Sequence, residues 1–118
     1  MKKTTYNTGM TGETLAEEYL CSKGMTILTR RYRGADGEID LVMQDGDILV
    51  FVEVKFRPTA KAGMGLMSVT PAKQRRLTHA AQHFLIEREW NDRLVRFDVV
   101  EITQDGLLHI PNAFSAVY

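Results

Sequence analysis

The chain has 118 residues, 44% of them hydrophobic and 25% charged, and its formal net charge is zero. These values are typical of one ordinary globular domain and exclude a disordered chain, and the balanced charge excludes a global electrostatic field that would attract nucleic acid. No apolar run approaches the roughly 20 residues that span a bilayer, and residues 1–8 lack the apolar stretch of a secretory signal, so we expect a cytoplasmic protein without membrane contact.

The N-terminal part of the chain predicts a flexible tail followed by a helix. Residues 1–9 are polar and show no periodicity, as mobile termini do. Apolar side chains recur at helical spacing from Leu15 onward, and Gly24 is a typical residue just beyond a helix end. We therefore predict a helix over 10–23, which opens a single domain that extends to residue 118.

Three strands are predicted next. Residues 25–33, 37–42 and 48–57 are rich in β-branched, aromatic and aliphatic side chains, and turn-forming sequences at 34–37 and 44–47 separate them. Connections this short predict that the three strands are antiparallel neighbours.

A loop and a second helix follow the strands. Residues 58–69 contain proline and two glycines without a clear period, which predicts a mobile loop. Thr70 suits the N-cap position and Pro71 the first helical position, and an apolar stripe then continues to about Trp90. The pattern predicts a helix over this stretch.

Strand-like composition resumes near the C-terminus. Residues 94–103 are rich in Val, Phe and Ile, and the turn sequence Asp105-Gly106 leads into a short strand over 107–110. The element order is therefore αβββαβ(β). This order predicts an α/β or α+β domain with one mixed sheet flanked by helices.

Two of the predicted strands carry charged residues where hydrocarbon is expected. Glu53 and Lys55 follow the apolar run 48–52, and strand alternation places both on one face. Asp40 lies in the preceding apolar strand, and if it faces the same way, two carboxylates and a lysine converge. Such a group suits Mg²⁺ or Mn²⁺, which would keep both buried carboxylates ionised. The alternative is a chance pair of charges on a solvated edge strand.

Basic residues gather around this acidic group in three clusters. They could hold phosphates, or they could simply be solvated faces of the molecule. The clusters are Arg30, Arg31 and Arg33; Lys55, Arg57 and Lys61; and Lys73, Arg75 and Arg76.

Three further polar residues have structural interpretations. His79 and His83 lie one helical turn apart and could chelate zinc, but no third ligand is obvious and the single cysteine excludes an all-cysteine site. We interpret them as helix-surface residues or minor phosphate contacts. Asp98, in an apolar strand, is expected to be buried and paired with a basic residue.

The motifs around the acidic group resemble those of a known family. Residues 37–42 (GEIDLV) and 51–57 (FVEVKFR) resemble the PD-(D/E)xK nuclease signature as it occurs in the YraN-like family of small bacterial proteins, which is distantly similar to archaeal Holliday junction resolvases. Ile39 and Asp40 stand where the signature has proline and aspartate. The resemblance implies a restriction-endonuclease-like core. Further matches lie at 12–20, at Lys73 and Arg76, and at 96–100.

The resemblance also implies roles for individual residues. Asp40 and Glu53 would be metal ligands with Glu13 as a further acidic ligand, and Lys55 would orient the attacking water or stabilise developing charge. Glu13 could instead be a favourable charge in the first turn of its helix. Glu38 could be an outer-sphere partner of the metal or a surface ion pair with an arginine. The candidates for gripping backbone phosphates are Arg33, Arg57, Lys73 and Arg76.

These interpretations lead to one functional prediction and one alternative. The prediction is a Mg²⁺- or Mn²⁺-dependent endonuclease that hydrolyses phosphodiester bonds in DNA, including branched or structured DNA. The alternative is a non-catalytic nucleic-acid-binding or adaptor protein that retains the nuclease fold, which zero net charge and small size favour. Because junction-cutting relatives act as symmetric dimers, a homodimer or a protein partner is a further expectation.

Overall fold

Five strands and two α-helices form the part of the chain that the computed structural model describes, residues 8–116, with side chains described from residue 12 onward. The fold is α+β, and its element order is the predicted one and is compatible with a nuclease-like core. In chain order the elements are α1 (Thr8–Ser22), β1 (Thr26–Gly34), β2 (Gly37–Asp45), β3 (Ile48–Arg57), the 3₁₀ turn η1 (Leu66–Ser68), α2 (Pro71–Glu87), β4 (Leu94–Thr103) and β5 (Gly106–Phe114).

The strands form one mixed sheet in the order β1-β2-β3-β4-β5. The first three strands are antiparallel, as predicted, and β4 and β5 are also antiparallel. The central pair, β3 and β4, is parallel and is joined through α2. A central strand covered on both faces needs apolar residues on both sides, which explains the long apolar run in β3.

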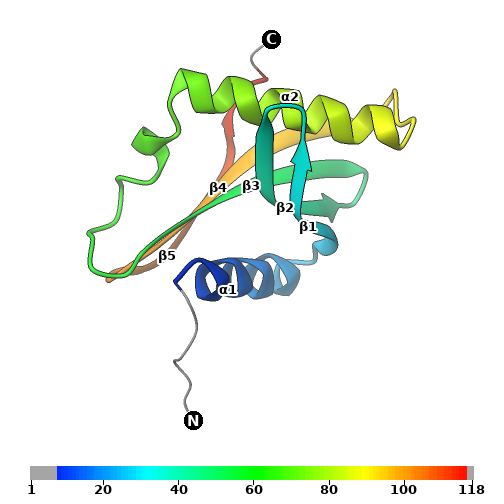
Figure 1. The fold of residues 1–118 in the computed structure, drawn as a ribbon. Coiled ribbons are helices and arrows are strands. Elements are labelled where there is room, and N and C mark those ends of the chain that lie inside the picture. The colour runs from blue at the N-terminus through cyan, green and yellow to red at the C-terminus, as the bar shows by residue number, and fades with distance from the viewer. Residues whose placement is uncertain (1–7, 117–118) are drawn as a thin grey trace.

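The two helices cover opposite faces of the sheet (Figure 1). On β3, side chains alternate between these faces, because Phe51 belongs to the core beneath α2 whereas Val50 and Val52 belong to the core beneath α1. The same alternation places Glu53 and Lys55 on the α2 side of the sheet.

Several element boundaries differ from the prediction. Of the predicted tail, residues 1–7 lie outside the described residues, and residues 8 and 9 belong to α1. Helix α2 ends at Glu87 and not near Trp90, because Glu89 has a positive φ of 56° that no helix continues through. No helix in the described part of the chain is both long enough and apolar enough to cross a membrane.

A buried carboxylate holds the segment that was expected to be a mobile loop. Glu101 of β4 is 1% exposed, and its Oε1 and Oε2 accept hydrogen bonds from the backbone N–H groups of Gly63 and Gly65, at 2.8 and 2.5 Å. A Cβ at Gly65 would lie 3.0 Å from this carboxyl group, so the close approach favours glycine. The 58–69 segment is therefore anchored to the sheet at two points, and its mobility stays a prediction.

Candidate active site

The candidate site lies where β2 and β3 separate. The two strands pair as far as Leu41 and Val52, and beyond them β2 continues alongside β1 while β3 continues alongside β4. Asp40 and Glu53, the next residues on the two strands, therefore stand at the point of separation. The N–H of Val54 donates a hydrogen bond to Asp40 Oδ2 at 2.8 Å. The Asp40 carboxylate thus bridges the two diverging strands.

Glu53 lies between two lysines in a nearly dry environment. Its side chain is 6% exposed, and its Oε2 is 2.9 Å from Lys55 Nζ on the same face of β3 and 3.6 Å from Lys73 Nζ in the first turn of α2. In residues 12–116, Glu53 Oε1 is the only buried side-chain nitrogen or oxygen without a hydrogen-bond partner. Buried polar atoms are normally paired, so this oxygen is a free acceptor in a place where an acceptor is costly.

Asp40 has a strongly perturbed acidity. Burial, and then the nearby Glu53 charge, raise the pKa of Asp40 to about 7, although the hydrogen bond from Val54 opposes the rise. A divalent cation beside Asp40 would favour its ionised form.

Glu13 reaches the site from α1, but Arg31 holds it. Gly12 allows the helix to approach β3 closely, because a Cβ there would lie 2.6 Å from the Cβ of Phe56. Glu13 Oε1 accepts a hydrogen bond from Arg31 Nε at 2.9 Å, and the Glu13 charge is near enough to raise the pKa of Asp40. The alternative interpretation of Glu13 is wrong, since α1 begins earlier than predicted and has no acidic residue in its first turn.

The oxygen atoms of the site suit a hard cation, but only two of the three expected carboxylate ligands are placed to bind one. In residues 12–116, no group of three or more His, Cys, Asp or Glu side chains is placed to hold a metal ion, so the implied set of Glu13, Asp40 and Glu53 is not assembled. Asp40 and Glu53 alone offer carboxylate oxygens, one of them unpartnered. Mg²⁺ and Mn²⁺ accept such ligands and take water in their remaining positions.

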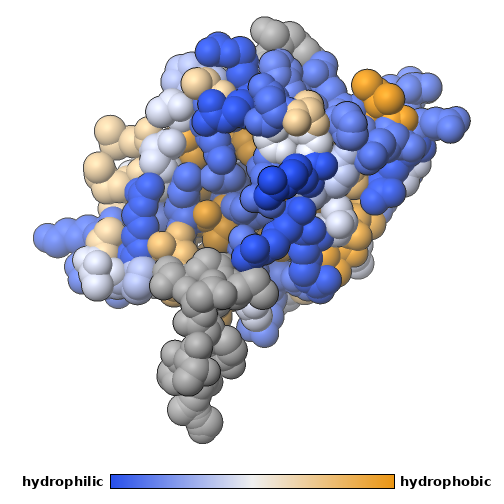
Figure 2. Space-filling model, in the orientation of Figure 1, coloured by the Kyte–Doolittle hydropathy of each residue, from blue (hydrophilic) through white to orange (hydrophobic). Residues whose placement is uncertain are grey.

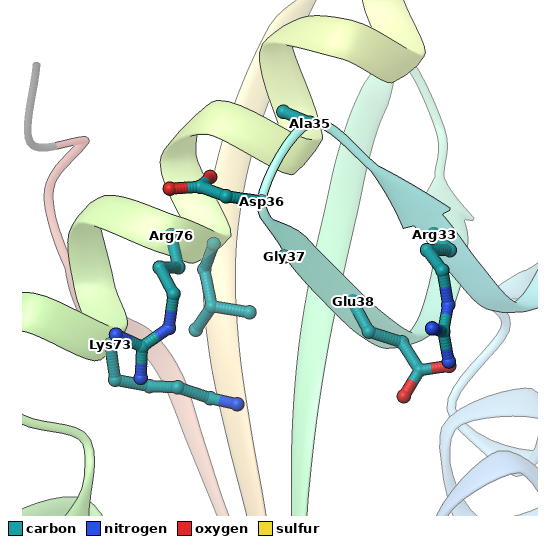
Figure 3. Close-up of a pocket in the computed structure, with 8 residues that line it drawn as sticks. Arg33, Ala35, Asp36, Gly37, Glu38, Lys73 and Arg76 are labelled. Atoms are coloured by element: carbon teal, nitrogen blue, oxygen red, sulfur yellow. The ribbon is translucent and has the colours of Figure 1, made fainter.

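Three of the four predicted phosphate-binding residues line one pocket beside the site. Arg33, Lys73 and Arg76 border a cavity of about 300 Å³ between the β1–β2 hairpin and α2, and Figure 3 shows Lys73 and Arg76 extending into this region from the helix. Gly37 allows the hairpin to pack this tightly, because a Cβ there would lie 2.5 Å from the Arg76 carbonyl oxygen. Lys73 connects the pocket to Glu53.

The pocket also contains acidic residues. Glu38 forms the surface ion pair that was the alternative to an outer-sphere role, with its Oε2 3.4 Å from Arg33 Nη2. Asp36 Oδ1 lies 3.3 Å from His79 Nδ1. Arg57, the fourth predicted phosphate contact, is the last residue of β3 and does not line this pocket.

The other histidine of α2 and Asp98 have structural partners. His83 Nδ1 is 2.6 Å from the Tyr32 hydroxyl, and the zinc alternative has no third ligand among the side chains of residues 12–116. Asp98 is fully buried, as predicted, and accepts hydrogen bonds from Arg96 at 3.0 and 3.2 Å, while His109 Nε2 lies 2.7 Å from it.

Sequence reasoning missed two residues that shape the site. Nothing in the sequence indicated that Arg31 would pair with Glu13, 18 positions away, or that it would have a positive φ of 51° beside Asp40. Glu101 could have been found, because it lies between Val100 and Ile102 in an apolar strand, the same signal that identified Glu53.

Comparisons with known proteins cover almost the whole of this structure. The model of a family described as uncharacterised protein family UPF0102 matches residues 12–102, which include every candidate site residue. UPF0102 proteins of Saccharophagus degradans and Geobacter metallireducens are 48% and 43% identical over 112 and 114 residues, which cover 92% and 93% of both chains. One of Alkalilimnicola ehrlichii is 44% identical over 110 residues, 92% of this chain and 87% of the relative. The chain therefore belongs to the UPF0102 family, the YraN family that its motifs resemble.

Proposed function

We propose that this protein is a metal-dependent endonuclease that hydrolyses phosphodiester bonds in DNA. The observation that supports the proposal best is the unpartnered Oε1 of Glu53, a buried carboxylate beside Asp40 and within 4 Å of two lysine ammonium groups. Structural carboxylates are normally saturated with hydrogen bonds, whereas a catalytic carboxylate keeps an acceptor free for its ligand.

Asp40 and Glu53 would hold Mg²⁺ or Mn²⁺. Such a cation, when bound, lowers the pKa of a coordinated water and polarises the phosphate. Lys55, fixed against Glu53 at 2.9 Å, offers its ammonium group to the negative charge that develops on the phosphate oxygens. Glu13 keeps its ion pair with Arg31 in this arrangement, so it would act through water or as a more distant charge.

The charge distribution supports a polyanionic substrate. Between Glu53 and Glu87 the sequence has six Lys or Arg and no Asp or Glu. The rest of the chain has nine Lys or Arg and all fifteen Asp and Glu. This stretch contains Lys55, Arg57 and the α2 side of the pocket. A chain with zero net charge can therefore present a local cationic surface to a DNA backbone.

A cleavage assay tests the proposal. Linear, flapped and four-way-junction DNA are incubated with the wild-type protein and Mg²⁺ or Mn²⁺, beside Asp40→Asn and Lys55→Ala. We expect each substitution to reduce cutting by about 100-fold or more, because each removes a group that acts on the reacting phosphate. Asp47→Asn, in the turn that joins β2 and β3, and Lys23→Ala, beyond α1, are matched controls that should cut like the wild type.

Equal residual cutting by the wild type and both site variants would indicate a contaminant and contradict the proposal. A second candidate function, a non-catalytic nucleic-acid-binding or adaptor protein, is favoured by the absence of a three-ligand metal group in residues 12–116. Calorimetric titration with Mn²⁺ separates the two, because an adaptor would give no heat of binding that depends on Asp40.

A further inference from the structure

Three exposed apolar side chains lie together on the connection between β3 and α2. Met64, Leu66 and Met67 are 52, 37 and 72% exposed. We call this stretch the 64–67 segment. Figure 1 shows the β3–α2 connection at the left, and Figure 2, in the same orientation, shows pale orange residues on that side of the molecule. Leaving several adjacent apolar groups in water is unfavourable, and such patches commonly mark binding surfaces.

The backbone beneath these side chains is fixed. Glu101 binds the N–H groups of Gly63 and Gly65 on either side of Met64. The Ser68 N–H and hydroxyl both donate to the Gly65 carbonyl, at 3.1 and 2.7 Å, and close the turn η1. The apolar tips therefore project from an anchored turn, so a ligand that packs on them orders little additional backbone.

The basic residues on both sides of the 64–67 segment in the sequence favour a polyanion as its ligand. The segment lies inside the acid-free stretch between Glu53 and Glu87, with Arg57 and Lys61 before it and Lys73 after it. It also joins the two elements that carry the site, since β3 contributes Glu53 and α2 contributes Lys73. Two carboxylates from other elements touch this connection, Glu101 beneath Gly63 and Gly65 and Asp105 at Ala62, and both accept backbone N–H hydrogen bonds from it. The exposed side chains of the 64–67 segment are themselves uncharged, so a strand whose phosphate occupies the site would meet apolar contact there.

We propose that the 64–67 segment packs against unpaired nucleobases of the bound DNA, a contact that rests on the proposed nuclease function and specifies its substrate class. In an intact duplex the flat faces of the bases are stacked and hidden, whereas a bulge, flap or junction exposes them. Met and Leu side chains pack against or insert between bases when these faces become accessible, and the flexible thioether adapts to different bases. The substrate class is therefore DNA in which unpaired nucleotides adjoin a duplex.

The experiment measures binding without divalent metal, so no cutting occurs. Fluorescence anisotropy in EDTA compares a labelled duplex that contains a bulge of unpaired thymidines with the fully paired duplex of the same length. We expect the wild type to prefer the bulged probe, and the double variant Met64→Ser/Met67→Ser to bind that probe about fivefold more weakly, with little change on the paired duplex. Ile86→Ser is the matched control, because Ile86 is also 72% exposed but lies on α2 away from the 64–67 segment.

Three outcomes would overturn the proposal: equal wild-type affinity for both probes, a double variant that keeps the preference, or an equal loss in Ile86→Ser. Thermal melting checks that the variants fold, which is expected for exposed positions. The failure of this contact and the failure of the nuclease are distinguishable. Cutting without a binding preference contradicts the contact alone, whereas a binding preference without Mn²⁺-dependent cutting contradicts the nuclease alone.

Discussion

Glu53 and Glu101 are two buried glutamates on neighbouring parallel strands, and they differ in how their charge is accommodated. They are 5 and 1% exposed, and both lie on the face of the sheet that α2 covers. Both oxygens of Glu101 accept backbone N–H hydrogen bonds from the 58–69 segment. Glu53 has one oxygen near two lysines and the other without a partner.

On the proposed function, this difference separates a structural carboxylate, Glu101, from a metal-binding one, Glu53. Burying a charge is unfavourable unless hydrogen bonds or opposite charges offset the loss of hydration. In Glu101, hydrogen bonds to both oxygens offset the cost of burial and attach the β3–α2 connection to the sheet. This role in the fold explains why the carboxylate is buried. In Glu53, opposite charges offset the cost of burial at one oxygen only, and the Glu53 charge also raises the pKa of Asp40. Such an arrangement does not favour stability, and the proposed metal site accounts for it because a bound cation would supply the missing partner.

The largest expected effect comes from removing the charge of Glu53. Glu53→Gln should lower Mn²⁺-dependent DNA cleavage by roughly 1,000-fold, because it removes a cation ligand while preserving shape. Its free energy of unfolding should stay within about 1 kcal/mol of the wild type, since the change also relieves repulsion with Asp40 and leaves Lys55 and Lys73 access to solvent.

The comparison for that assay is Glu101→Gln, measured well below its melting temperature. It should retain cleavage within a few-fold of the wild type. Glu101 is the cross-strand neighbour of Lys55, but both of its oxygens accept hydrogen bonds from the 58–69 backbone, and no described hydrogen bond or ion pair joins it to Asp40, Glu53 or Lys55. If the two glutamine variants lost activity equally, the division between a structural and a functional glutamate would not stand.

The next effect is a dependence of stability on pH. The folded protein raises the pKa of Asp40 to about 7, above its ordinary value of 3.8, so the folded state holds this proton more tightly than the unfolded chain does. The stabilisation is fully present below about pH 4 and is lost as the pH rises through 7. In EDTA the unfolding free energy should therefore fall by on the order of 3 kcal/mol over this range.

Urea unfolding at several pH values measures this slope, and Asp40→Asn should remove most of it. Addition of Mn²⁺ should restore stability near pH 7 in the wild type, because the cation binds the ionised carboxylates. A wild-type slope that survives in Asp40→Asn would assign the titration to another group.

The smallest effect is the loss of stability in Glu101→Gln. A glutamine amide accepts on one side only, so one of the two N–H groups, of Gly63 or Gly65, would lose its acceptor. The expected cost is about 1–3 kcal/mol of unfolding free energy, measured by urea denaturation. Glu38→Gln, which alters an exposed ion pair with Arg33, is the matched control and should change stability by less than about 1 kcal/mol.

Much of the fold was predictable because its signals are local. The N-cap at Thr70, which accepts a hydrogen bond from the Lys73 N–H, and the proline after it mark the start of α2 in any context. Strand alternation alone placed Glu53 and Lys55 on one face. The end of α2 was less predictable, because the positive φ of Glu89 has no signature in its side chain.

The sequence by itself determined the type and order of the elements and the presence of a charged pair inside a central strand, since these follow from residue periodicity and caps within a few positions. Only the tertiary structure decided that β2 and β3 separate at Asp40, that Lys73 approaches Glu53, that Arg31 holds Glu13 and that Glu101 anchors the 58–69 segment. The contacts of Arg31 with Glu13, of Lys73 with Glu53 and of Glu101 with the 58–69 segment join residues 18 to 38 positions apart. Their geometry depends on how helices and strands pack against one another, which no local pattern encodes.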